Sequence, residues 1–304
     1  MNKLVRLACL LITTQLLAAC EPPPTEKPLP YSNAAPPARL AIYRLAIHPS
    51  YNPEKLGTMY QPLIDHLNRQ LADGQLELEA SRDYAAFEQK IAARQPAFLL
   101  PNPWQTLQAI KAGYHVIAMA GDASDFKGII LVRQDGGIRK PADLKGKTVS
   151  YPSPTALAAA IMPQYFLHTR GLDIQRDIDN VYVGSQESSI MNVYLGKSAA
   201  GATWPPPWRL FQKEYPQEAA ALKVIWQTPP LVNNSLMVRD DVPDNVRDQV
   251  AKLLYQLGQR ESDNAILAAM ETTRFYAAND RSYDVVATYI ERFEKQVRPV
   301  ESKE

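Results

Sequence analysis

Residues 145–171 read KGKTVSYPSPTALAAAIMPQYFLHTRG, and this stretch decides the fold class. The apolar segment 148–151 is short enough to be a strand. The segment from about 156 to 168 has the length and apolar content of a helix, which is expected to stop at Gly171. A second strand is expected at 181–183. A strand, a helix and a strand in this order predict a parallel α/β unit.

The same alternation continues in both directions along the chain. Before the quoted stretch, strands are expected at 40–47, 76–80, 97–100, 115–120 and 128–133. After it, strands are expected at 200–203, 223–226 and 235–239. Helices separate most of these strands, and three further helices are expected near the carboxyl end. Pro62 is assigned to the first turn of a helix, the only part of a helix interior that tolerates proline well. The predicted class is α/β with helices on both faces of the sheets.

The chain of 304 residues is too long for one compact core, which favours two lobes. A proline- and asparagine-rich stretch at 228–234 is interpreted as the return of the chain to the first lobe. The expected division is lobe 1 at 39–123 plus 232–304, and lobe 2 at 124–231.

The amino terminus has the pattern of an export signal. A basic start precedes the apolar segment 7–19, which at 13 residues is too short to span a bilayer. The tetrapeptide Leu17-Ala18-Ala19-Cys20 resembles the lipobox of bacterial lipoproteins, which implies a signal peptide at 1–19 and lipidation of Cys20. The alternative is an ordinary signal peptide that happens to precede a cysteine. A lone thiol in the mature chain favours the lipoprotein, because Cys9 lies inside the signal.

Residues 21–38 contain seven prolines and almost no apolar side chain larger than alanine. Such a segment cannot pack into a core. With Cys20 it is expected to act as a semi-rigid tether, roughly 50 Å long at about 3.1 Å per residue.

Composition and motifs exclude or leave unsupported several classes of protein. A net charge of +1 offers no basic field for a nucleic acid. The four histidines are far apart in the sequence, so neither a metal site nor a cofactor is predicted. Residues 184–188 superficially resemble a nucleophile elbow but lack its second glycine. No enzyme is therefore predicted.

The loops after the predicted strands are the best candidates for a binding site, because ligands in open α/β sheets bind beyond the carboxyl ends of strands. These loops lie at 48–51, 81–84, 101–104, 152–156, 184–188 and 203–208. The loop at 152–156 suits an anion, since Ser153 and Thr155 precede a helix start with free N–H groups. The alternative is that one of the two hydroxyls only caps the helix. His48 is expected to be satisfied by solvent or backbone groups.

Several motifs together resemble the periplasmic phosphate/phosphite/phosphonate-binding proteins of ABC importers. They are DFKGIILVR at 125–133, ADLKGKTV at 142–149, Tyr60-x-Pro62-Leu63, DYAA at 83–86, GLD at 171–173, ATW at 202–204 and VIW at 224–226. The resemblance covers most of residues 40–255. It implies a two-lobed, type II-like periplasmic-binding-protein fold with a ligand cleft between the lobes.

The chain departs from the family pattern at three places in the expected site. The usual Ser-Thr-Ser run reads Ser153-Pro154-Thr155-Ala156, and the usual histidine is replaced by Gln186, followed by Glu187. The acid expected after Thr203-Trp204 is missing. These changes weaken the assignment of the ligand, because an oxyanion needs many hydrogen-bond donors.

The resemblance implies an extracytoplasmic lipoprotein that binds a small oxyanion by closure of its lobes and delivers it to an ABC permease in the inner membrane. A monomer anchored on the periplasmic side is expected. The alternatives are a sensory module acting with a receptor kinase, an enzyme of unknown type on the same scaffold, a divergent member with a less charged ligand, and a degenerate pocket. The predicted ligand-binding residues are Tyr51, Tyr84, Asn102, Ser153, Thr155, Gln186, Glu187 and Trp204.

Overall fold

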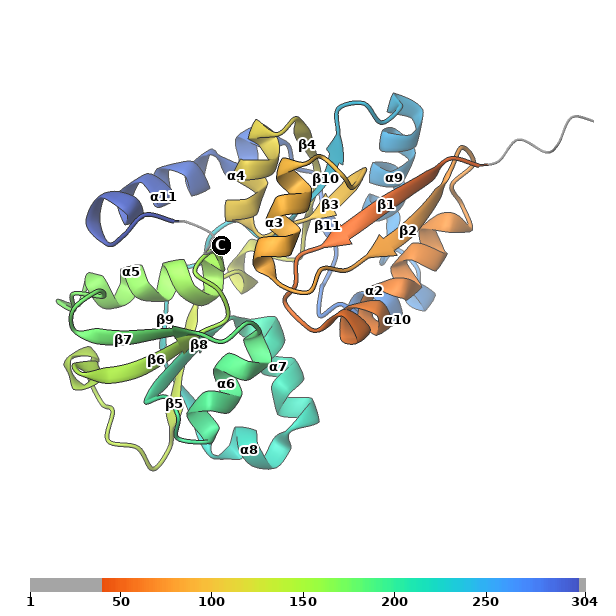
Figure 1. The fold of residues 1–304 in the computed structure, drawn as a ribbon. Helices are drawn as coiled ribbons and strands as arrows, with labels where there is room; N and C mark the ends of the chain where they lie inside the picture. The colour runs from red at the N-terminus through yellow and green to blue at the C-terminus, as the bar shows by residue number, and fades with distance from the viewer. Residues whose placement is uncertain (1–39, 301–304) are drawn as a thin grey trace, which may run out of the picture. The chain divides into compact units, whose positions relative to one another are not determined.

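Two mixed β-sheets carry the fold in the computed structural model, which describes residues 40–300 (Figure 1). Residues 40–304 form a compact unit of their own. The signal at 1–19, the lipidated Cys20 and the tether up to residue 38 lie outside the described residues. The two helix-covered sheets confirm the predicted α/β class.

The first sheet has the strand order β11-β4-β10-β3-β1-β2. Its strands are β1 (Ile42–Ile47), β2 (Gln75–Glu79), β3 (Phe98–Leu100), β4 (Tyr114–Ala120), β10 (Ser235–Arg239) and β11 (Phe275–Tyr276). Strand β1 runs parallel to β2 and β3, so the loops that follow these three strands emerge at one edge. Strand β10 is antiparallel to both β3 and β4.

Side chains of the first sheet alternate between its two faces, and helices bury both. Leu45 and Ile47 pack in one cluster with α2, α9 and α10, while Ala46, Leu99 and Met237 pack in another with α3, α4 and α11. The bounds are α2 (Pro53–Asn68), α3 (Tyr84–Ala92), α4 (Pro103–Lys111), α9 (Asp244–Gln256), α10 (Asn264–Ala269) and α11 (Asp284–Gln296). We call this sheet with its helices the first lobe.

The second sheet has the order β7-β6-β8-β5-β9. Its strands are β5 (Ile129–Arg133), β6 (Lys147–Tyr151), β7 (Ile178–Tyr182), β8 (Ala200–Thr203) and β9 (Leu222–Gln227). Strand β6 is parallel to β7 and β8, whereas β5 is antiparallel to β8 and β9. The loops after β6, β7 and β8 therefore emerge together. This sheet with its helices is the second lobe.

Helices cover both faces of the second sheet as well. Val149 and Ile130 pack toward the helix that follows β6, and Leu131 packs toward α6 and α7. The helix after β6 starts as a π-helix (Leu157–Ile161) and continues as α5 (Met162–His168), and the others are α6 (Gln186–Tyr194), α7 (Pro205–Glu214) and α8 (Pro216–Ala220). Short 3₁₀ turns lie at Ala123–Asp125, Pro141–Leu144, Glu261–Asp263 and Asp280–Tyr283.

Three expectations differ from the structure. The sheets are mixed, because β4, β10 and β11 in the first and β5 in the second bring antiparallel pairs. Pro62 lies inside α2 and not in its first turn. The helix starts earlier because Asn52 caps it, accepting from the Lys55 N–H at 2.9 Å, and Pro53 occupies its first position. The predicted loop at 203–208 is helical from Pro205 onward, since prolines fit the first turn of a helix.

Two segments carry the chain between the sheets, at 121–128 and 228–234. They hydrogen-bond to each other: the Thr228 N–H donates to the Gly128 carbonyl and the Leu231 N–H to the Phe126 carbonyl. A Cβ on Gly128 would lie 2.5 Å from the Ala158 carbonyl oxygen, so only glycine fits there. The two crossing segments therefore run side by side, and Gly128 packs against the start of the helix at 157.

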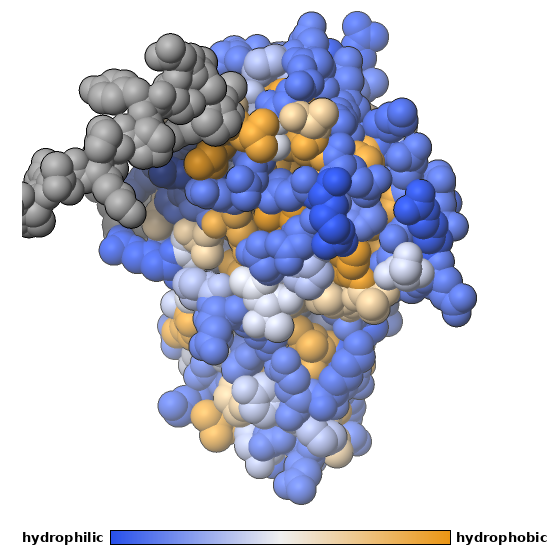
Figure 2. Space-filling view, turned by 90° about the vertical axis from the view of Figure 1, so that its right-hand side faces the viewer, coloured by the Kyte–Doolittle hydropathy of each residue, from blue (hydrophilic) through white to orange (hydrophobic). Residues whose placement is uncertain are grey.

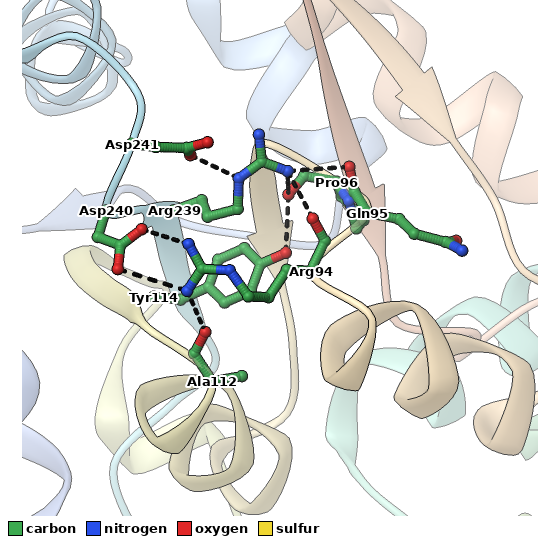
Figure 3. Close-up of polar contacts among 8 residues, drawn as sticks. All are labelled: Arg94, Gln95, Pro96, Ala112, Tyr114, Arg239, Asp240 and Asp241. Carbon is green, nitrogen blue, oxygen red and sulfur yellow. Dashed lines mark hydrogen bonds and ion pairs between the residues drawn. The ribbon is translucent and has the colours of Figure 1, made fainter.

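A cluster of arginines fixes the edge of the first sheet that is opposite to the loops after β1 and β3 (Figure 3). Arg239 donates to the carbonyl of Arg94 at 2.5 Å, and Arg94 donates to the Ala112 carbonyl and pairs with Asp240. The Tyr114 hydroxyl donates to the Pro96 carbonyl at 2.8 Å. These bonds satisfy the backbone of the turn before β3 and hold the start of β3, β4 and the end of β10 together.

The face shown in Figure 2 is mainly hydrophilic, with hydrophobic residues exposed in patches among the hydrophilic ones. Large exposed hydrophobic side chains within 40–300 include Leu40, Ile42, Leu195 and Val285. In that range no helix combines the length and the apolar character needed to cross a bilayer.

Candidate functional site

The carboxyl-end loops of the two sheets enclose a small cavity between the lobes, which we call the inter-lobe cavity. Its lining comes from both sheets and from the crossing segments: His48, Tyr84, Asn102, Phe126, residues 156–159, Gln186, Trp204 and Asn234. The cavity has a volume of about 10 Å³, which is the space of about one water molecule. Tyr84, Asn102, Gln186 and Trp204, all predicted as ligand-binding residues, are brought together here.

The start of the helix after β6 forms one wall of this cavity. The N–H groups of the first residues of any helix have no partner within it, and here residues 157–159 line the cavity. The helix dipole adds positive potential at the same end. No side chain caps this helix start, so the interpretation of Ser153 or Thr155 as a mere cap is wrong. The wall is therefore suited to an anion.

A chain of polar side chains crosses the cavity from lobe to lobe. The Thr203 hydroxyl donates to Gln186 Oε1 at 2.8 Å, which fixes the amide so that Gln186 Nε2 donates to the Tyr84 hydroxyl at 3.2 Å. Tyr84 accepts there and keeps its own hydroxyl proton for another acceptor. Burial raises the pKa of Tyr84, so it stays a neutral donor.

A second set of inter-lobe bonds lies behind the cavity wall. The Thr155 hydroxyl donates to Glu88 Oε1 at 2.6 Å, and Asn102 Nδ2 donates to the Thr155 carbonyl at 3.2 Å. Ser153 and Thr155 are buried and 3.0 Å apart at their hydroxyls. Neither is among the lining residues of the cavity, so the structure places these two predicted residues beside the site and not on its surface.

A further cavity of about 30 Å³ adjoins the first at His48, Trp204 and Asn234. We call it the outer cavity. Tyr51, predicted from the sequence, lies here with its hydroxyl buried, and that hydroxyl and Asn234 Oδ1 have no hydrogen-bond partner among the described residues. Trp204 packs on Phe126 with ring centroids 5.6 Å apart.

Carboxylates gather around the outer cavity. Asp122, Asp125 and Glu271 belong to its lining. Arg209 of α7 donates to both oxygens of Asp125 and to Glu271, so its charge is already neutralised. Lys213 also pairs with Glu271, so three carboxylates face two cations on this side of the site. The balance of one negative charge disfavours an anionic substituent here.

His48 is buried, and its Nδ1 lies 3.1 Å from the Leu100 carbonyl. A carbonyl can only accept, so Nδ1 carries the proton. Burial lowers the pKa of His48 to about 4, so the ring is neutral at pH 7. The expectation of a backbone partner is confirmed, although His48 also lines both cavities.

Glu187, like Ser153 and Thr155, belongs to the lining of neither cavity. Its carboxylate accepts from the Tyr215 hydroxyl at 3.1 Å and pairs with Lys55 of the first lobe at 3.4 Å. It therefore contributes to contact between the lobes at the outside of the site.

Sequence reasoning missed Glu88, Gln105, Phe126 and Asn234. Phe126 and Asn234 come from the crossing segments. The proline- and asparagine-rich character of 228–234 was a signal for Asn234, whereas 121–128 contains neither residue type. Glu88 lies one helical turn inside α3, where no loop pattern marks it. Gln105 is the third residue of α4 and forms a capping box with Asn102, and this Asn-x-x-Gln spacing was the available signal. Within residues 40–300, no group of His, Cys, Asp or Glu side chains is arranged to hold a metal ion.

Residues 45–283 match the family described as periplasmic substrate-binding proteins of ABC phosphonate transporters. A curated relative from Prochlorococcus marinus, described as a probable ABC transporter phosphite-binding protein, is 23% identical over 181 residues. That match covers 55% of this chain and 61% of the relative. The chain thus matches less than two thirds of the length of this relative.

Solved structures share the fold. A binding-protein component of an ABC phosphonate transporter from Pseudomonas aeruginosa has a TM-score of 0.78 at 16% identity, covering 85% of this chain and 88% of that one. A Prochlorococcus marinus protein in complex with methylphosphonate has a TM-score of 0.75 at 20% identity, covering 84% and 98%. At these identities the likeness shows a two-lobed binding-protein fold.

Proposed function

Because this chain belongs to the family of periplasmic substrate-binding proteins of ABC phosphonate transporters, we propose that it binds a small oxyanion such as phosphate, phosphite or a phosphonate between its lobes. The bound, closed form would then dock on an ABC permease in the inner membrane. The observation that carries the proposal is the inter-lobe cavity, which has a helix start on one side and neutral donors on the other.

The small size of the cavity implies that the lobes open to admit a ligand and close around it. A space of about 10 Å³ cannot admit an oxyanion, so a ligand enters only when the lobes separate and the bond between Gln186 and Tyr84 opens. The hinge would be the paired segments 121–128 and 228–234. We propose lobe 1 at 39–123 plus 232–304 and lobe 2 at 124–231. A ligand that contacts both lobes favours the closed state.

Among the predicted ligand contacts we retain Tyr84, Asn102, Gln186 and Trp204 at the inter-lobe cavity, and Tyr51 at the outer cavity. Ser153 and Thr155 are proposed to position the helix start, because they lie behind its wall.

Titration of the protein without residues 1–38, which keeps the compact unit, tests the proposal. Phosphate, phosphite, methylphosphonate, aminoethylphosphonate and sulfate are the probes, followed by thermal unfolding and calorimetry. A ligand at about 100 times its Kd adds roughly 2.7 kcal/mol to the free energy of unfolding. Tyr84→Phe removes one donor to a charged group, so its Kd should rise at least about tenfold.

Tyr43→Phe is the matched control, since Tyr43 packs on Phe98 in the core of the first lobe and is not part of either cavity. It should bind like the unchanged protein. Wild-type affinity in Tyr84→Phe would remove Tyr84 from the site, and the absence of stabilisation by every oxyanion would refute the function.

We also propose that the protein is a monomeric lipoprotein, cleaved after residue 19 and held on the periplasmic side through a lipid on Cys20. The lipobox-like sequence and the proline-rich tether support this. Several acyl chains at about 0.8 kcal/mol per buried CH₂ would anchor it stably. Mass spectrometry of the membrane-extracted protein should find a diacylglyceryl group on Cys20. An unmodified Cys20 or an intact signal would contradict this.

A further inference from the structure

The direction of the hydrogen bonds around Glu88 can be traced from a fixed backbone donor. The Asn102 N–H donates to Gln105 Oε1 at 3.1 Å, so the amide nitrogen of Gln105 must face the other way. It donates to Glu88 Oε1 at 3.0 Å. Glu88 Oε1 is therefore an acceptor, as an ionised carboxylate must be.

Two hydroxyl groups of the loop after β6, those of Thr155 and Ser153, continue this chain of hydrogen bonds. The Thr155 hydroxyl lies 2.6 Å from Glu88 Oε1, a length typical of a hydroxyl that donates to a carboxylate. Having given its single proton to Glu88, the Thr155 oxygen can only accept from Ser153, 3.0 Å away. Ser153 in turn accepts from the Thr155 N–H. Both hydroxyl protons are thus directed toward Glu88 and neither is available to a ligand.

The residues around the inter-lobe cavity offer no positive charge to a ligand. No lysine or arginine belongs to its lining, and the neutral His48 adds no positive charge at pH 7. Arg298 approaches the loop at 152–156 from beyond α11, but it donates to the Pro154 carbonyl and to Gln164 and lies outside the lining. The donors left for a ligand are neutral: the helix-start N–H groups and the Tyr84 hydroxyl.

We propose that Glu88 is a specificity-determining residue that makes the site select singly charged oxyanions over doubly charged ones. The inference rests on the proposed function. The carboxylate of Glu88 lies next to the cavity wall, because it binds the Thr155 hydroxyl and the following residue, Ala156, lines the cavity. Burial is the main cause of the raised pKa of Tyr84, and the charge of Glu88 adds to it. For two like charges about 10 Å apart, at an effective dielectric constant near 20, the repulsion corresponds to about a tenfold loss of affinity.

Methylphosphonate and methanesulfonate are a matched pair of probes for this selection. Both carry one negative charge at low pH, but only methylphosphonate loses a second proton near neutral pH, as a phosphate monoester does. With the protein lacking residues 1–38, the Kd of methylphosphonate should rise about tenfold or more between pH 6 and pH 9, while that of methanesulfonate stays constant. His48, with its pKa of about 4, stays neutral over this range.

Glu88→Gln tests the residue. Its amide oxygen at the position of Oε1 can still accept from both Gln105 and Thr155, so both hydrogen bonds are kept and only the charge is removed. The rise in the methylphosphonate Kd between pH 6 and pH 9 should shrink to about threefold or less. Glu77→Gln, at an exposed position of β2, removes the same charge away from the site and should behave like the unchanged protein.

Phosphorus NMR of bound methylphosphonate gives a reading that needs no variant. The chemical shift should remain that of the singly charged form in the unchanged protein at a pH where free methylphosphonate is doubly charged. A doubly charged bound form, or equal pH dependence in Glu88→Gln and the unchanged protein, would overturn the inference while leaving oxyanion binding intact. If neither methylphosphonate nor methanesulfonate bound to the unchanged protein or to either variant, the proposed function and this inference would be refuted together.

Discussion

His48 shows at the scale of one residue how burial couples this fold to pH. Its ring is buried between the lobes' loops and donates to the Leu100 carbonyl. Burial, the main cause, lowers the pKa of His48 to about 4 from its ordinary 6.5, while the backbone bond partly offsets this. The unfolded chain therefore binds one more proton than the folded protein between these two values.

The free energy of unfolding should accordingly fall as the pH is lowered from 6.5 to about 4. The His48 contribution is fully present above pH 6.5, and its loss amounts to roughly 3 kcal/mol. Replacement by glutamine, His48→Gln, keeps a donor for the carbonyl and removes the titration. Urea unfolding at several pH values should show a flatter pH profile for the variant.

The same replacement at His168, which is only partly buried and stacks on Tyr165, is the control. It should leave the slope between pH 6.5 and 4 unchanged. Parallel profiles for His48→Gln and the unchanged protein would show that the buried imidazole does not govern acid stability.

At the scale of elements, the fold could be predicted because it depends on local patterns. The strand and helix around 148–168 appear as β6 and the π-helix followed by α5, and Asp83 caps α3 by accepting from the Ala86 N–H at 2.8 Å. Errors occurred where two local rules compete. The aversion of proline to helix interiors predicts Pro62 in a first turn, but Asn52 caps α2 and the helix already starts at Pro53.

The site could be predicted less completely, for the same physical reason. Four lining residues of the inter-lobe cavity could be predicted because they lie in or next to loops after strands, a position that the sequence reveals: Tyr84, Asn102, Gln186 and Trp204. Glu88 was missed because its role depends on a contact with Thr155, 67 residues away in another lobe. The periodicity of hydrophobic residues predicts strands and helices, but it does not predict which side chains meet between the two lobes. Glu187 was included on the same loop argument, yet its side chain turns outward to Lys55 and Tyr215.

At the scale of the whole molecule, inter-lobe ion pairs flank the site. Lys55 of α2 pairs with Glu214 of α7 at 2.5 Å, and Arg209 and Lys213 of α7 pair with Glu271 near the end of α10. Together with the bonds of Tyr84 and Glu88, they hold the lobes in a closed arrangement. Opening must break these pairs, and the paired crossing segments are where the backbone can turn.

The most direct test of binding between the lobes is a crystal structure of the protein with methylphosphonate at saturating concentration. The account predicts the phosphonate between the lobes, its oxygens within hydrogen-bond distance of the N–H groups at 157–159 and of the Tyr84 hydroxyl. A phosphonate bound outside the inter-lobe cavity, or touching one lobe only, would contradict it.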